Sequence, residues 1–187
     1  MNKLVFLLLF FVLSLTGFSQ DTTKVKKEFD YEGFLKSQSK KYFGVQYPEF
    51  KVKTSESSVF SNADLVNKII FITFWFESCA PCIAEIDGFN EMFVKLKSNS
   101  NFLFVSFTFD PDSTIRKLVT KYNIKYKVIH IDKPECYRLN FKNGFPSSFI
   151  LDKKGIIRYF KTGGEIDKAR ATKAVLTEIY PQILALL

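Results

Sequence analysis

Cys79 and Cys82 are separated by two residues and stand where a strongly apolar segment gives way to an amphipathic one. Residues 69–76 are nearly all apolar and rich in β-branched and aromatic side chains, which predicts a strand buried on both faces. From residue 83 onward, apolar residues recur at intervals of three and four, which predicts a helix. Cys79 is therefore expected at a helix N-terminus, where free N–H groups and the helix dipole lower a thiol pKa from its usual ~8.5. This pattern predicts a redox-active dithiol.

A structural disulfide is the alternative interpretation of this pair. The loop between Cys79 and Cys82 is so short that closing it removes little conformational entropy from the unfolded chain, so the bond would add little stability. A redox role explains the pair better. In that role Cys79 attacks a substrate disulfide as a thiolate, and Cys82 then resolves the mixed disulfide.

Met1–Ser19 has the composition of an export signal. Lys3 precedes an almost uninterrupted apolar run over residues 4–15, and Gly17-Phe18-Ser19 is a small-x-small cleavage pattern. The run is shorter than the ~20 apolar residues of a comfortable membrane span, and an uncleaved N-terminal anchor is the alternative. Either form places the working domain outside the cytoplasm, in the periplasm or cell envelope, where a disulfide persists. The mature chain is expected to begin at Gln20.

The composition suits one soluble domain with a generous core. The chain has 187 residues, 22 of them phenylalanine, and a formal net charge of +8. Its lysines are spread along the sequence rather than gathered into a tract, which indicates a solvated basic surface. No nucleic-acid partner is therefore expected.

The order of the predicted elements defines the fold class. Residues 20–47 are polar and are expected to form an N-terminal extension, a linker with a loosely docked helix. Alternating strands and helices, then a hairpin and a last helix that Pro181 must kink or restart, imply a mixed sheet covered on both faces. Strands are predicted near residues 48–52, 59–60, 69–76, 102–109, 126–131, 147–151 and 156–161, and helices near 63–67, 80–97, 134–140 and after Gly163-Gly164. Residues 110–113, which begin with Asp110, are predicted as a turn and helix start that lead into a helix through about Tyr122.

Three segments together resemble the thioredoxin superfamily, and within it the exported TlpA/ResA-like thiol–disulfide oxidoreductases. Phe74-Trp75 ahead of Cys79-Ala80-Pro81-Cys82 resembles the active-site strand and helix start, and Glu85 matches the glutamate of the Cys-x-Pro-Cys-x-x-Glu pattern. Gly144–Asp152 resembles the Gly-x-Pro-Thr-x-Phe-x-x-Asp segment, whose proline is cis and faces the disulfide. The match covers roughly residues 48–187.

The resemblance implies an α/β, thioredoxin-like domain over residues 48–187. This domain has a central mixed sheet flanked by helices, an inserted helix–strand unit and an N-terminal strand extension. Glu85, one helical turn beyond Cys82, is implied to exchange a proton with that thiol if burial raises its pKa. Pro146 is implied to be cis and to present backbone to a substrate strand. Phe145, which precedes it, is expected to shape the local redox environment.

Two departures from the family pattern affect the site. Thr73 replaces the buried aspartate of thioredoxin, six positions before the first active cysteine, so proton handling falls to Glu85. Ser78 replaces the tryptophan that usually precedes the first cysteine, which alters the rim that partners touch.

The function expected from these residues is protein-disulfide reduction without a cofactor or metal. The resemblance implies a membrane-bound or thioredoxin-type electron donor and exported disulfide-containing substrates, such as cytochrome c apoproteins. The fold works as a monomer, and a monomer is expected.

Two alternative functions stay open. In the first, Cys79 and Cys82 bind and transfer copper with His130, the only histidine, as a third ligand, although its strand-like surroundings favour a structural role. In the second, the chain is a thiol peroxidase of the AhpC/TSA type, although Phe76 stands where such enzymes typically have threonine. The remaining thiol, Cys136, is unpaired by count and is expected to be buried, with a regulatory thiol as the alternative.

Overall fold

The computed structural model describes residues 33, 37, 40–54 and 57–187. The predicted signal at Met1–Ser19 and most of the predicted extension over residues 20–47 lie outside this part of the chain. Within the described part, every helix falls short of the length and apolar character that a membrane crossing requires.

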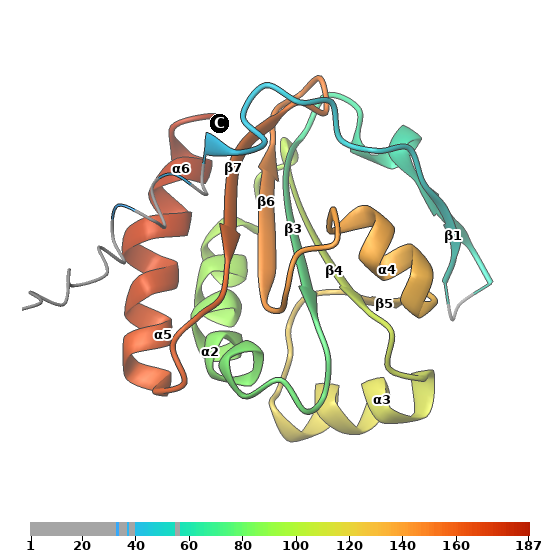
Figure 1. Ribbon diagram of the computed structural model, residues 1–187, viewed down its shortest axis with the longest axis vertical. Coiled ribbons are helices and arrows are strands. Elements are labelled where there is room, and N and C mark those ends of the chain that lie inside the picture. Colours follow the sequence, from blue (N-terminus) through green and yellow to red (C-terminus); the bar gives the residue numbers. More distant parts are fainter. Residues whose placement is uncertain (1–32, 34–36, 38–39, 55–56) are drawn as a thin grey trace, which may run out of the picture. The chain divides into compact units, whose positions relative to one another are not determined.

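A five-stranded mixed sheet forms the centre of the domain, with the strand order β5-β4-β3-β6-β7 (Figure 1). The strands are β3 (Ile69–Trp75), β4 (Phe102–Thr108), β5 (Val128–His130), β6 (Ser147–Leu151) and β7 (Ile157–Thr162). The first three are parallel to one another, and β6 and β7 join antiparallel. The central strand β3 is buried along its whole length, because both faces of the sheet are covered, and its sequence is accordingly almost continuously apolar.

Helices cover both faces of the sheet and create two cores (Figure 1). One face is covered by α2 (Ala80–Leu96) and by the C-terminal segment of α5 (Lys168–Ala174), η2 (Val175–Ile179) and α6 (Tyr180–Leu184). The other is covered by α4 (Lys133–Leu139) and the separate hairpin of β1 (Lys51–Lys53) and β2 (Val59–Ser61), which leads into the 3-10 turn η1 (Asn62–Leu65). The unit of α3 (Asp112–Lys121) and β5 is the expected helix–strand insertion, and the hairpin is the expected N-terminal strand extension.

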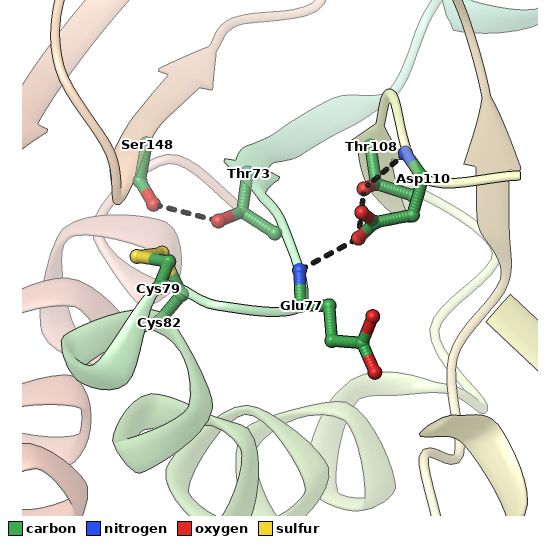
Figure 2. Close-up of a disulfide and its surroundings, with 7 residues drawn as sticks. All are labelled: Thr73, Glu77, Cys79, Cys82, Thr108, Asp110 and Ser148. Atoms are coloured by element: carbon green, nitrogen blue, oxygen red, sulfur yellow. Dashed lines mark hydrogen bonds between the residues drawn. A yellow bond between two sulfur atoms is a disulfide. The ribbon is translucent and has the colours of Figure 1, made fainter. Parts of the chain in front are cut away.

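On the face of the sheet that α2 covers, one row of register partners across the strands is polar. Ser106 of β4 and Ser148 of β6 are the register partners of Thr73 in β3, and Lys161 of β7 is the partner of Ser148. The Ser148 hydroxyl donates a hydrogen bond of 3.2 Å to Thr73 Oγ1 (Figure 2). The hydroxyl-bearing members of this row are almost fully buried, although most of this face is apolar.

The last helix is interrupted in the way that its proline requires. Pro181 lies in the first turn of α6, and the turn before it, η2, is a π-helix. A single π-helical turn of this kind can accommodate a break in the α-helical hydrogen-bond ladder, such as the one caused by the missing N–H of proline. The helix crosses α2 at Gly88, where a β-carbon would lie 2.9 Å from Val175 Cβ, so this crossing requires glycine.

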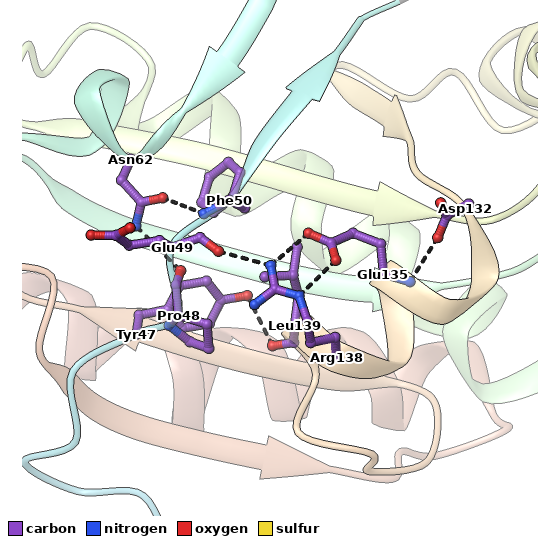
Figure 3. Close-up of polar contacts among 9 residues, drawn as sticks. All are labelled: Tyr47, Pro48, Glu49, Phe50, Asn62, Asp132, Glu135, Arg138 and Leu139. Atoms are coloured by element: carbon purple, nitrogen blue, oxygen red, sulfur yellow. Dashed lines mark hydrogen bonds and ion pairs between the residues drawn. The ribbon is translucent and has the colours of Figure 1, made fainter.

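The segment ahead of β1 is attached to α4 (Figure 3). Tyr47 is 1% exposed, and its hydroxyl donates a hydrogen bond of 3.0 Å to the Leu139 carbonyl oxygen. Arg138 pairs with Glu135 at 2.6 Å and donates to the Glu49 carbonyl oxygen at 2.7 Å. Close packing therefore begins upstream of the expected domain boundary at residue 48.

Candidate active site

Cys79 and Cys82 form a disulfide at the N-terminus of α2 (Figure 2). Cys79 is the N-cap residue, with an extended backbone at φ −86° and ψ 94°, and its carbonyl oxygen accepts the first helical hydrogen bond, from Ile83 N. Pro81 lies in the first turn, where no intrahelical hydrogen bond needs its missing N–H. When the pair is reduced, the free N–H groups of this turn and the helix dipole favour a thiolate at Cys79.

The loop that leads into the disulfide is held by Asp110 (Figure 2). The buried Asp110 carboxylate accepts hydrogen bonds from Glu77 N at 2.7 Å and from Thr108 Oγ1 at 2.9 Å. The sequence predicts Asp110 in the turn and helix start over residues 110–113, whereas α3 begins at Asp112. The Asp110 side chain instead fixes the backbone two residues before Cys79.

The peptide bond between Phe145 and Pro146 is cis. Pro146 is buried and, together with Cys82, borders a small space under the disulfide. The Phe145 ring makes edge-to-face contacts with Phe76 at 5.2 Å and with Tyr137 at 5.5 Å between ring centroids. An aromatic cluster therefore adjoins both the loop before Cys79 and the cis proline.

Glu85 is buried beside Cys82, with 2% of its surface exposed. The two side chains border the same small space as Thr73 and Pro146, and this space has no room for a water molecule. Glu85 Oε2 has no hydrogen-bond partner among the residues that the structure describes. Burial raises the pKa of Glu85 to about 8, with Lys161 opposing the rise and Glu178 adding to it. A carboxyl group of this pKa can exchange a proton with a thiol near neutral pH.

Cys136 and His130 do not join this site. Cys136 is fully buried in the core on the opposite face of the sheet, and burial raises the pKa of its thiol to about 12. His130 is exposed, and its Nδ1 lies 2.8 Å from the Asp110 carbonyl oxygen. In the described ranges, no three His, Cys, Asp or Glu side chains gather as metal ligands would.

Four residues at the site were not identified by sequence analysis. The sequence predicts Asp110 only as a turn residue and Gly164 only as part of the glycine pair ahead of the last helix. Lys161 and Glu178 form an ion pair of 2.9 Å at the edge of the site. The alternation of side chains along a strand could have indicated Lys161, because Lys161 lies two residues after Tyr159 and therefore faces the same side of the sheet, the side that α2 covers.

Comparisons with known proteins agree with this geometry. A family model described as the AhpC/TSA family matches residues 43–160, more than half of the chain. Thioredoxin-like protein YneN of Bacillus subtilis (strain 168) is 25% identical over 159 residues, which cover 84% of this chain and 87% of YneN.

Solved structures share the fold. A thiol:disulfide interchange protein of the thioredoxin family from Chlorobium tepidum TLS is 25% identical, with a TM-score of 0.56 over 70% of this chain and 93% of that chain. A secreted Mycobacterium tuberculosis disulfide oxidoreductase homologous to E. coli DsbE is 19% identical, with a TM-score of 0.58 over 73% of this chain and 96% of that chain.

YneN is named as a thioredoxin-like protein and the two solved structures as proteins of disulfide chemistry, and these names favour neither copper transfer nor peroxide reduction. The dithiol pair at the start of α2 has the spacing that such exchange needs. The family match and the relatives together show that this chain belongs to the AhpC/TSA family and is a thioredoxin-type thiol:disulfide oxidoreductase.

Proposed function

We propose that the protein is an exported protein-disulfide reductase whose Cys79–Cys82 dithiol passes two electrons to disulfides of other exported proteins. The observation that carries this proposal is the arrangement at the start of α2. Cys82 of the disulfide, the buried carboxyl group of Glu85 and the cis Pro146 come together around one space that is too small for a water molecule.

The first step is the attack of the Cys79 thiolate on a substrate disulfide. A bond forms between Cys79 Sγ and one substrate sulfur, the substrate S–S bond breaks, and the other substrate sulfur leaves as a thiolate that takes a proton from water. Cys79 suits this role because it caps the helix and benefits from the dipole in its anionic form.

The second step releases the substrate and oxidises the protein. The Glu85 carboxylate takes the proton of the Cys82 thiol, and Cys82 Sγ attacks Cys79 Sγ in the mixed disulfide. The bond between Cys79 and the substrate breaks, and the substrate leaves as a second thiolate. The dithiol has then lost two electrons and the substrate has gained them.

Pro146 and Phe145 are proposed to orient the substrate. A cis peptide bond exposes backbone that an extended substrate chain can pair with in β fashion. The aromatic cluster around Phe145 offers an apolar surface beside it. Cytochrome c apoproteins are among the proposed substrates, on the basis of the family resemblance alone.

The proposed direction of electron flow follows from the residues near Cys79. Ala80 and Pro81 have no side-chain donor for the Cys79 thiolate, and the buried ionisable side chain nearest in sequence, Glu85, is acidic. A thiolate that the helix N-terminus stabilises without further side-chain donors leaves the dithiol form less favoured than one that also has such donors, which makes the pair more reducing. The proposed electron donor is a membrane-bound or thioredoxin-type protein.

Export is proposed from Met1–Ser19, and cleavage is expected to leave Gln20 as the first residue. The secreted Mycobacterium tuberculosis neighbour is compatible with this location. Because Cys79, Cys82, Glu85 and Pro146 all come from one chain, a monomer is the proposed working form. The intact mass of the protein recovered from a bacterial periplasm tests the cleavage site, and an uncleaved chain in the membrane fraction contradicts it.

Redox titration of residues 20–187 tests the function. We expect a two-electron couple near or below ~−230 mV when Cys79 and Cys82 are followed by alkylation with mass tags. A potential near ~−120 mV would assign the protein as an oxidant instead. Cys79→Ser should abolish insulin reduction and Cys82→Ser should accumulate the mixed disulfide, whereas Cys136→Ala, which removes a thiol from the opposite core, should leave exchange unchanged.

A further inference from the structure

The carboxyl group of Glu85 rests against the chain that leaves β7. Gly164, two residues beyond the end of this strand, approaches Glu85 so closely that a β-carbon there would lie 3.0 Å from Oε1. Gly163 N donates a hydrogen bond of 2.9 Å to the Pro146 carbonyl oxygen, which fixes this chain beside the cis proline. The segment that follows β7 therefore packs against both the Glu85 carboxyl group and the cis proline.

Lys161, in β7, points toward the face of the sheet that α2 and the C-terminal helical segment cover, where it pairs with Glu178. It is the register partner of Ser148, which donates to Thr73, and Thr73 borders the same space as Glu85 and Cys82. The Lys161 side chain is only 11% exposed. A charged side chain that is largely buried is rarely found without a counter-charge.

Glu178 is one counter-charge of Lys161. Its Oε2 lies 2.9 Å from Lys161 Nζ, and its side chain is 49% exposed. The ion pair therefore extends from the buried side of β7 to the protein surface. Glu178 lies in the π-helical turn η2, and its ion pair with Lys161 links this turn to the edge strand β7. Turns of this kind often occur where a side chain has a special task.

Glu85 faces few charged groups. Tyr126, from the segment before β5, and Tyr159, from β7, both interact with it, but burial raises the pKa of each hydroxyl above its ordinary value, so both stay neutral. On its own helix it neighbours Cys82. Within the described part of the chain, Lys161 and Glu178 are the charged side chains that act on the Glu85 carboxyl group.

We propose that Lys161 is a positioning residue that serves as the charge partner of Glu85, and that Glu178 holds it in place from the π-helical turn. Lys161 stabilises the carboxylate that accepts the proton of Cys82, and Glu178 balances the ammonium group once Glu85 becomes neutral. This inference rests on the proposed function for its catalytic consequence, but the charge coupling itself does not depend on activity.

A carboxyl titration of the oxidised protein tests the coupling directly. We expect Lys161→Met to raise the pH midpoint of Glu85, followed by carbon-13 NMR, by about one pH unit, because a cation that favours the carboxylate is lost. Glu178→Gln should lower the midpoint, because an anion is lost. Lys95→Met is the matched control, since Lys95 pairs with Glu91 on the same helix but is 47% exposed, and it should cause no shift.

Two further measurements distinguish a structural effect of the Lys161 substitution from an effect on proton transfer. Lys161→Arg should keep the wild-type midpoint, because the positive charge remains. In Lys161→Met, the pH profile of mixed-disulfide resolution should shift by the same amount as the Glu85 midpoint. In a Glu85→Gln background, Lys161→Met should leave this profile unchanged.

Several results would overturn the assignment. An unchanged Glu85 midpoint in Lys161→Met, or a shift in the same direction in Glu178→Gln, contradicts the charge partnership. Glu178 is half exposed, so Glu178→Gln gives an answer even if Lys161→Met does not fold. If the midpoints shift as expected while the wild-type protein reduces no disulfide, the charge partnership stands and the proposed function fails.

Discussion

The backbone of Gly164 lies directly against the carboxyl group of Glu85. A β-carbon at Gly164 would lie 3.0 Å from Glu85 Oε1 and 3.2 Å from Pro146 Cγ, distances tighter than ordinary van der Waals contact. The buried acid, the cis proline and the chain after β7 therefore form one close-packed unit beside Cys82. Any side chain at Gly164 must displace part of it.

Gly164→Ala is expected to slow disulfide exchange by displacing the Glu85 carboxyl group or Pro146. Misplacing a proton-transfer group commonly reduces a rate by about 10-fold to 100-fold. Insulin reduction and the rate of mixed-disulfide resolution measure the effect. Gly144→Ala is the matched control, because a β-carbon at Gly144 meets nothing within 4 Å. Equal losses in both variants would contradict the role of this contact.

Glu85 should make stability depend on pH. Burial raises its pKa from 4.5 to about 8, so between these values the folded protein holds a proton that the unfolded chain has lost. The free energy of unfolding should therefore fall as pH rises through this window, by up to about 1.4 kcal/mol for each pH unit, and level off above pH 8.

Chemical denaturation of the oxidised protein at several pH values between 5 and 9 measures this slope. Glu85→Gln should remove it, because glutamine does not titrate. Glu91→Gln, on the exposed side of the same helix, should retain it. A wild-type slope that survives in Glu85→Gln would assign the pH dependence to another group.

Asp110→Ala should destabilise the loop that precedes Cys79. The substitution leaves the Glu77 N–H and the Thr108 hydroxyl without their acceptor, and a buried unpaired donor costs about 1–3 kcal/mol. Urea denaturation measures the loss. Asp87→Ala serves as the control, because its contact with Lys168 is 3.9 Å long and exposed, and such pairs contribute about 1 kcal/mol or less.

Gly88→Ala should push the C-terminal helix away from α2. The new methyl group would lie 2.9 Å from Val175 Cβ and 3.0 Å from Thr172 Cα, and overpacking of this kind costs about 1–3 kcal/mol. Thermal unfolding should show a lower midpoint. Val175→Ala in the same chain should recover part of the loss, and a double-mutant cycle with no coupling would rule out this crossing as the cause.

Local patterns of the sequence were sufficient to predict the elements that carry the disulfide. The apolar run over residues 69–76 became the fully buried β3, and the helical spacing after Ile83 became α2. Both predictions are correct because a strand buried on two faces leaves a continuous apolar run, whereas a helix buried on one face leaves apolar residues at intervals of three and four. The family resemblance, not periodicity, supplied the cis proline and Glu85.

Prediction was less accurate where a tertiary contact overrides the local pattern. A strand was predicted over residues 126–131, but β5 spans only Val128–His130. Tyr126 instead stacks on Phe104 with ring centroids 4.2 Å apart, in the core beneath α2. In the sequence, an aromatic residue next to a strand can belong to the strand or to the adjacent core. Here the stacking on Phe104 places Tyr126 in the core.

By itself, the sequence determined the chemistry of the site: two thiols at a strand–helix junction and an acid one turn further on. Only the tertiary structure decided which groups surround that acid. Lys161 reaches it through the register of β6 and β7, Glu178 through a π-helical turn, and Gly164 through the path of the chain after β7. These neighbours are far from Glu85 in the sequence, and it is strand register and helix packing that bring them to it.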